Sequence, residues 1–181
     1  MDSNETIPNI SIDLVKKLAL ARLQFLIKRP DLIIVDDSGE NRVFAAWRSL
    51  ILVSGPQLRI TLKVYFRLAT AQALAAPVFR TDPKGVHKDQ AIDFIREYCN
   101  LTAGGIKLAL SDLGFQTGIS LPIVTRGFDE IFFHLDGALG KIFHWEICGD
   151  DVRLPISCFI ETLDAGFPSL AVEKFNSEGN E

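Results

Sequence analysis

The chain has 181 residues, of which 48% are hydrophobic and 23% charged, and its formal net charge is −4. This length favours one domain that buries about 70% of its unfolded surface, and the composition excludes global disorder. The acidic balance argues against a nucleic-acid partner, and no apolar run approaches the ~20 residues that span a membrane.

The first half of the chain predicts a helix, three strands and a short helix. The first helix covers about residues 11–28, and its apolar spacing favours a buried stripe. That stripe consists of Leu14, Leu18, Ala21 and Phe25. Leu20 and Leu23 fall outside it, which indicates burial on more than one side. The strands are expected at 32–35, 43–53 and 58–66, and the short helix at 69–75.

The second half repeats this order with a longer helix. That helix is expected from about His87 to Leu113 and ends at Gly114. Four strands are expected after it, at 119–125, 130–135, 141–147 and 152–160. The last two read as a hairpin because the turn between them is short and contains Gly149, Asp150 and Asp151.

Helices that alternate with groups of strands predict an α/β or α+β fold, in which helices pack on a largely antiparallel sheet. The repeated order of elements indicates two layers built from a duplicated unit. We expect one domain over residues 10–162, with terminal extensions at 1–9 and 163–181.

The long helix carries the most informative pattern. At about 100° per residue, Asp93, Glu97 and Asn100 fall within about 60° of one another on one face. The opposite, apolar stripe consists of Ile92, Ile95, Cys99, Ala103, Ile106, Leu110 and Leu113. Two like charges at i,i+4 and a glycine at Gly104 both weaken a helix, so this outer face suits a docking partner.

Simpler interpretations of the same residues remain open. Polar residues on an outer helix face are often only solvated, and Gly104-Gly105 could serve close packing against another helix. Cys99 points toward the core and reads as a small buried hydrophobe. The histidines lack metal-ligand spacing: His87, His134 and His144.

The cysteines and the start of the chain favour a cytoplasmic protein. Cys99, Cys148 and Cys158 form an odd set at wide spacing, which is typical of reduced thiols. Residues 1–5 are acidic and polar, unlike the basic start of a signal peptide.

The pattern Asp93-x-x-x-Glu97-x-x-Asn100, followed by Gly104 and Lys107, resembles the signature of the CheC/CheX/FliY chemotaxis phosphatases. The strand with Ile119-Ser120-Leu121-Pro122 resembles CheX as well. The similarity covers about residues 10–160, and the motif itself covers 91–127.

The resemblance implies a CheC-like fold and a phosphatase that acts on the phospho-aspartate of a CheY-like response regulator. Asn100 would orient the attacking water and Glu97 would pair with a lysine of the regulator. Asp93 and Gly104 would support docking. The chain would need no cofactor of its own, because the regulator supplies Mg²⁺.

Departures from the family pattern qualify this expectation. The first helix has Asp13-x-x-x-Lys17-x-x-Leu20, which lacks the glutamate and asparagine of a second signature, so one site per chain is expected. A homodimer is expected from the apolar composition and the alternating strand at 142–147. The alternative function is a non-catalytic module that binds a regulator or joins a flagellar-switch assembly.

Overall fold

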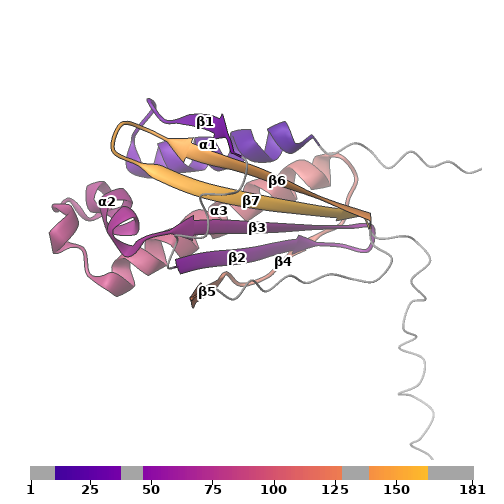
Figure 1. Cartoon of the computed structure of the whole chain (residues 1–181). Helices are drawn as coiled ribbons and strands as arrows, with labels where there is room; N and C mark the ends of the chain where they lie inside the picture. The colour runs from indigo at the N-terminus through magenta and orange to yellow at the C-terminus, as the bar shows by residue number, and fades with distance from the viewer. Residues whose placement is uncertain (1–10, 38–46, 128–138, 163–181) are drawn as a thin grey trace, which may run out of the picture.

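The computed structural model describes residues 11–37, 47–127 and 139–162, and these form one sheet covered by helices (Figure 1). The predicted strand at 130–135, His134, the beginning of the strand predicted from residue 43 and the two terminal extensions lie outside the described residues.

The described strands form a single sheet in which every neighbouring pair is antiparallel. The sheet order is β1-β6-β7-β3-β2-β4, and β5 also pairs with β2. The strands are β1 (Ile33–Asp36), β2 (Trp47–Ser54), β3 (Leu58–Phe66), β4 (Gly118–Ile119), β5 (Ile123–Arg126), β6 (Leu139–Cys148) and β7 (Arg153–Thr162).

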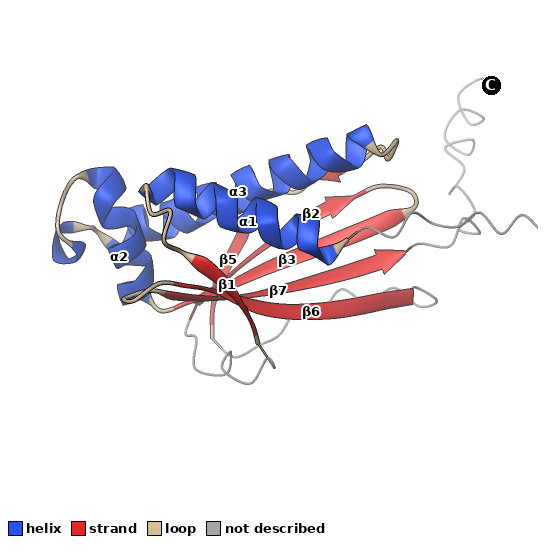
Figure 2. Cartoon of the chain, turned by 90° about the horizontal axis from the view of Figure 1, so that it is seen from above, coloured by secondary structure: helices blue, strands red, loops and turns tan. Residues whose placement is uncertain are grey.

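Within the described residues, α-helices cover one face and one end of this sheet (Figure 2). They are α1 (Ile12–Ile27), α2 (Leu68–Phe79) and α3 (Lys88–Asp112), and a 3-10 turn, η2 (Pro83–Gly85), precedes α3. The core lies between the two layers, where alternate residues of β3, such as Ile60, Leu62 and Val64, meet the helices. The two-layer α+β class is therefore confirmed. Among the described helices, none is long and apolar enough to cross a membrane.

The expected duplication is visible in the strand order. The first half contains α1, β1, β2 and β3, and the second half contains the corresponding elements α3, β4/β5, β6 and β7. If each strand is replaced by its counterpart in the other half, the strand order of the sheet is the same when read from the opposite edge. In each half the long hairpin pairs with the short strand of the other half: β1 lies on β6, and β4 and β5 lie on β2. The two halves therefore form one sheet, and α1 and α3 are equivalent helices that pack against each other.

The apolar stripe predicted for α1 is wrong. The buried residues are Val15, Ala19, Leu23 and Ile27. Leu14 and Leu18 are only half-buried, Ala21 is exposed, and Phe25 is 75% exposed. The small Ala19 lets α3 come close to α1. The Tyr98 hydroxyl on α3 donates to the Ala19 carbonyl at 3.2 Å.

The strand predicted over 119–125 is divided in two by Pro122. Ser120 still pairs with β2, since its N–H donates to the Leu52 carbonyl at 2.9 Å and its hydroxyl accepts from the Leu52 N–H at 3.0 Å. Pro122 has no N–H to continue the ladder. The pairing resumes at Ile123, so β4 and β5 are separate strands.

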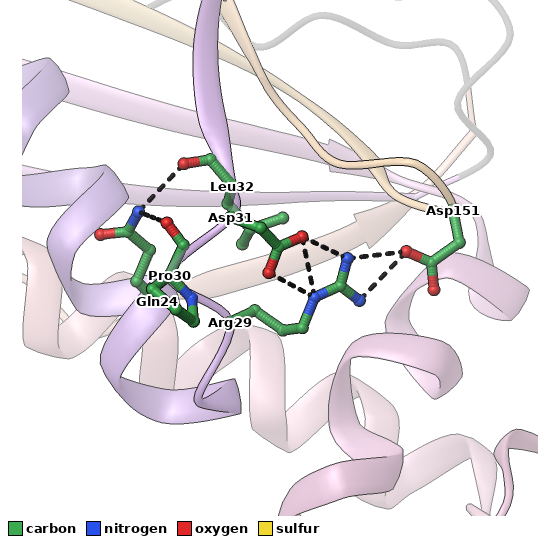
Figure 3. A network of polar contacts seen from close by, with 6 residues as sticks. All are labelled: Gln24, Arg29, Pro30, Asp31, Leu32 and Asp151. Atoms are coloured by element: carbon green, nitrogen blue, oxygen red, sulfur yellow. Dashed lines mark hydrogen bonds and ion pairs between the residues drawn. The ribbon is translucent and has the colours of Figure 1, made fainter.

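A polar network holds the end of α1 near the β6–β7 turn (Figure 3). The Arg29 guanidinium donates to Asp31 at 2.7 and 2.8 Å and to Asp151 at 3.1 Å. The Gln24 amide donates to the Pro30 and Leu32 carbonyls. The hydrogen bond from Arg29 lowers the pKa of Asp31, so this carboxylate stays charged across the neutral range.

Candidate functional site

Both ends of α3 are fixed by local hydrogen bonds. At the beginning, the Gln90 side-chain oxygen accepts from the His87 N–H at 2.9 Å, which satisfies a backbone donor that the helix leaves open. At the end, Gly114 adopts φ +87°, a left-handed conformation that glycine tolerates. The predicted end at Gly114 is thus confirmed, and the helix has a defined length of 25 residues.

The inner face of α3 is packed into the core. Its buried residues include Ile92, Ile95, Cys99, Ala103, Ile106 and Leu110, as predicted. Leu113, the last member of the predicted stripe, is 52% exposed. The helix ends at Asp112, so Leu113 is the C-cap residue and no longer follows the helical spacing.

Asp93, Glu97 and Asn100 are all exposed on the outer face of α3. Within the described residues, neither Glu97 nor Asn100 has a hydrogen-bond or ion-pair partner. An amide and a carboxylate one turn apart are therefore free to contact another molecule. Because the opposite side of the helix is buried, both groups are presented on a rigid support.

The two glycines of α3 have different surroundings. A Cβ added to Gly104 would meet no atom within 4 Å, so this position is open on the outer face. A Cβ added to Gly105 would lie 3.4 Å from Leu18 Cδ2 and 3.7 Å from Arg22 Nε, both on α1. Gly105 therefore serves helix packing, whereas Gly104 leaves a gap beside Asn100 that a partner's backbone could fill.

The adjacent residues Tyr98 and Cys99 of α3 lie away from this face. Both side chains are fully buried. Burial raises the pKa of the Cys99 thiol to about 12, so it remains protonated and acts as a small apolar group, as predicted. Cys148 and Cys158 are also free and buried.

Sequence reasoning missed one feature of the outer face, an ion pair between Asp93 and Arg96. Arg96 Nη1 donates to Asp93 Oδ1 at 2.8 Å, and the two side chains are 46% and 67% exposed. An acid three residues before an arginine on a helix is a known favourable spacing, and that signal was present in the sequence. The pair offsets the like-charge repulsion between Asp93 and Glu97.

Cations gather where α3 begins beside β5. The Lys88 ammonium lies 5.2 Å and the Arg126 guanidinium 5.6 Å from the centre of the Trp47 ring. Such contacts stabilise each cation modestly and keep its charge at the surface. Farther along the same edge, Ile119, Leu121 and Ile123 are exposed apolar residues next to α3.

The two histidines within the described residues make structural contacts. His87 caps α3, and His144 Nδ1 lies 3.0 Å from the Ser157 hydroxyl. Within the described residues, no three acidic, histidine or cysteine side chains cluster as metal ligands do. On α1, Asp13 and Lys17 are exposed and Leu20 is half-buried, so the equivalent face of α1 has a lysine and a leucine where α3 has the glutamate and the asparagine.

Comparison with known proteins identifies the fold. No family model and no curated protein sequence matches the chain. CheX from Vibrio vulnificus is 19% identical with a TM-score of 0.65, over 83% of this chain and 95% of that one. A CheC-like superfamily protein from Shewanella sp. PV-4 is 19% identical with a TM-score of 0.63, over 83% and 96%.

A further similar structure is a complex with a partner protein. A chain of the CheX–CheY–BeF3–Mg²⁺ complex from Borrelia burgdorferi is 13% identical with a TM-score of 0.62, over 84% of this chain and 97% of that one. These proteins are matched over nearly their whole length. The chain therefore has the CheC-like fold that its sequence predicts.

Proposed function

We propose that the chain is a phosphatase for the aspartyl phosphate of a CheY-like response regulator, and that the outer face of α3 is its active surface. The observation that carries this proposal is a pair of polar side chains, Glu97 and Asn100, that have no partner among the described residues and are exposed one turn apart on a helix fixed by the core. The CheC-like fold, and the CheX–CheY complex among the similar structures, support the choice of partner.

The proposed reaction uses a positioned water rather than a nucleophile of this chain. The water oxygen bonds to phosphorus as the bond from phosphorus to the aspartate oxygen breaks. The electron pair of that bond stays on the carboxylate, and both protons of the water leave with inorganic phosphate as H2PO4⁻. Such a reaction depends mainly on alignment and on charge stabilisation.

Asn100 suits the alignment step. Its amide oxygen accepts a hydrogen bond from the water, and its NH2 group donates to a phosphoryl oxygen, so one side chain holds both reactants in line. The amide does not ionise near neutral pH and does not itself attack phosphorus. In this proposal Asn100 is the catalytic residue of the chain.

Glu97 suits docking. Its carboxylate lies one turn before Asn100 and within about 60° of it around the helix, where a lysine of the regulator can form a charge-assisted hydrogen bond. This contact fixes the register of the helix on the regulator. The open position at Gly104 lets the regulator approach on the other side of Asn100.

The Mg²⁺ that the reaction requires belongs to the regulator in this proposal, and it would neutralise charge on the phosphoryl oxygens. The carboxylates of this chain's outer face do not form a ligand set for it. Asp93 is paired with Arg96, and Glu97 stands alone among the described residues. The chain contributes alignment and docking groups.

The test is phosphate release from phosphorylated response regulators of the same organism. Substoichiometric wild-type chain should accelerate release from at least one regulator. Asn100→Ala should lower kcat by about 100-fold or more, the scale on which misplacing a reactant costs rate. Glu97→Ala should chiefly raise KM, because it removes a docking contact.

The alternative, a non-catalytic module that binds a regulator or joins a flagellar switch, gives a different result. Such a chain would bind the regulator through the same face and leave its autodephosphorylation rate unchanged. The exposed amide of Asn100 favours the enzyme, since docking alone does not require an amide beside the acid.

Two further properties belong to this proposal. The chain acts in the cytoplasm, where two-component regulators are phosphorylated, and it forms a homodimer. In this proposal the domain that carries the activity covers residues 10–162, with terminal extensions at 1–9 and 163–181.

A further inference from the structure

The Asp93–Arg96 ion pair changes what the outer face presents to a partner. Asp93 Oδ1 accepts from Arg96 Nη1 at 2.8 Å, so the carboxylate is already engaged within the chain. Arg96 has five N–H donors, and among the described residues only Nη1 is used. The face therefore offers a guanidinium with free donors, held by an acid.

Arg96 and Glu97 lie on opposite sides of Asn100. At about 100° per residue, Arg96 is about 40° to one side of Asn100 and Glu97 about 60° to the other. Gly105, which contacts α1, lies beyond Glu97, so Glu97 is on the α1 side and Arg96 faces the β4 and β5 side. The amide thus stands between a positive and a negative group.

This order suits an aspartyl phosphate better than it suits docking alone. During hydrolysis, negative charge is spread over the three equatorial oxygens of the phosphoryl group, and nearby donors stabilise it. A guanidinium matches such oxygens with a planar fork of N–H groups. Arg96 is one turn before Asn100 and half-exposed, so its long side chain can reach the same atoms.

The exposed ion pair does not prevent this contact. Surface pairs between exposed side chains are weakly held, because water screens the charges and the side chains lose entropy in one geometry. Arg96 can therefore turn free donors toward a phosphoryl group while Asp93 keeps the guanidinium near the helix.

We infer that Arg96 is a second substrate-contacting residue, whose guanidinium donates to the phosphoryl oxygens beside Asn100, and that Asp93 is a positioning residue for Arg96. This inference rests on the proposed phosphatase function. It replaces a docking role for Asp93 with an indirect one, and it makes the positive charge of Arg96 part of catalysis.

Kinetics of phosphate release from the phosphorylated regulator test the inference, with Arg96→Gln, Arg96→Lys, Asp93→Asn and the double variant Asp93→Asn/Arg96→Gln. Arg96→Gln should lower kcat at least tenfold, and Arg96→Lys should retain part of the rate. Asp93→Asn should lower kcat less than Arg96→Gln does. In the Arg96→Gln background, Asp93→Asn should have no further effect, because Asp93 acts through Arg96.

Controls separate catalysis from net charge and from folding. Lys17→Gln makes the same charge change on the exposed face of α1, away from the proposed site, and should leave kcat and KM unchanged. Thermal unfolding of each variant should stay near that of the wild type. Binding to a regulator loaded with beryllofluoride, a mimic of the phosphoryl group, should weaken for Arg96→Gln.

The outcomes distinguish the inference from the function on which it rests. If Arg96→Gln keeps wild-type kcat while Asn100→Ala loses the acceleration, the phosphatase proposal stands and the inference is wrong. If Asp93→Asn raises KM equally with and without Arg96, Asp93 is a docking acid and the inference is again wrong. If the wild-type chain accelerates no regulator, both fail.

Discussion

At the scale of residues, the chemistry of the proposed site depends on two side chains that have no partner in the part of the chain that the structure describes. Glu97 and Asn100 are exposed on α3 and face solvent together. Ordinary solvated helix faces also look like this, so exposure alone does not define a site. The open position at Gly104 adds a second observation. An alanine at this position would stabilise the helix without any clash, yet the chain has a glycine there.

Gly104 gives a prediction in which stability and activity change in opposite directions. Gly104→Ala should raise the free energy of unfolding by about 0.5–1 kcal/mol, because helix propensity improves and no atom obstructs the new methyl group. The same methyl group should raise KM for the phosphorylated regulator. Chemical denaturation and phosphate-release kinetics measure the two effects.

Gly105→Ala is the matched control for this prediction. Its methyl group would contact Leu18 on α1 rather than a partner, so KM should not change. A Gly104→Ala variant that is more stable and has wild-type KM would show that no partner approaches at this position.

The positions of the signature residues could be predicted from helical spacing alone, because the long helix has one clearly apolar side. Asp93, Glu97 and Asn100 are exposed where the helical wheel places them. The partner of Asp93 was not predicted, although the i,i+3 spacing to Arg96 was readable in the sequence. Exposure follows from periodicity, whereas the choice of a side-chain partner depends on which neighbouring charges the fold leaves nearby.

At the scale of elements, α1 shows where periodicity fails. The helix is apolar over a wide arc, and two stripes at i,i+4 spacing both fit a buried face. The choice depends on α3, against which the small Ala19 packs and the large Phe25 does not. Tertiary contact therefore decides between two stripes that the sequence makes nearly equal.

Two substitutions on α1 test this corrected orientation. Leu23→Ala should cost about 2–5 kcal/mol of the free energy of unfolding, because Leu23 is fully buried in the core. Phe25→Ala should change it by less than about 0.5 kcal/mol, since the ring is mostly exposed. Urea denaturation gives both values, and the reverse order would contradict the structure.

The central strands give a second prediction at this scale. Arg59 on β3 and Glu161 on β7 are register partners and form a two-bond ion pair at 2.5 and 2.7 Å, with Glu161 fully buried. Glu161→Gln should lower the free energy of unfolding by about 3 kcal/mol, because it replaces one partner of a buried, hydrogen-bonded ion pair with a neutral amide. A cost below about 1 kcal/mol in denaturation would show that the pair is solvated.

At the scale of the whole molecule, the alternating apolar pattern at 142–147, now part of β6, does not indicate a dimer by itself. Trp145 and Ile147 are fully buried in the chain's own core. The exposed apolar residues at this edge of the sheet are Ile33 and Val35 on β1 and Ile142 on β6. The proposed dimer is therefore best placed at this edge, where β1 is the outermost of the described strands and carries exposed apolar side chains.

Sedimentation velocity at micromolar concentration tests the dimer. The wild-type chain should sediment as a dimer, and Val35→Lys should shift it toward the monomer without loss of the folded state, since a charge on an edge strand opposes pairing. A wild-type monomer at these concentrations would contradict the dimer and leave the proposed active surface unaffected.

The fold at this scale was largely predictable, because element order, antiparallel pairing and duplication follow from the pattern of helices, strands and turns. The pairing across the two halves, in which β1 lies on β6 and β4 and β5 lie on β2, was not. These contacts join residues more than 60 positions apart, and short strands carry little pattern that specifies a distant neighbour.

The central claim is tested most directly by single-turnover phosphate release at saturating chain, for wild type and Asn100→Ala on the same phosphorylated regulator. We predict that the wild-type chain accelerates release and that Asn100→Ala binds with similar affinity but loses the acceleration by about 100-fold. Equal release rates for the regulator alone, with wild type and with the variant would contradict the account.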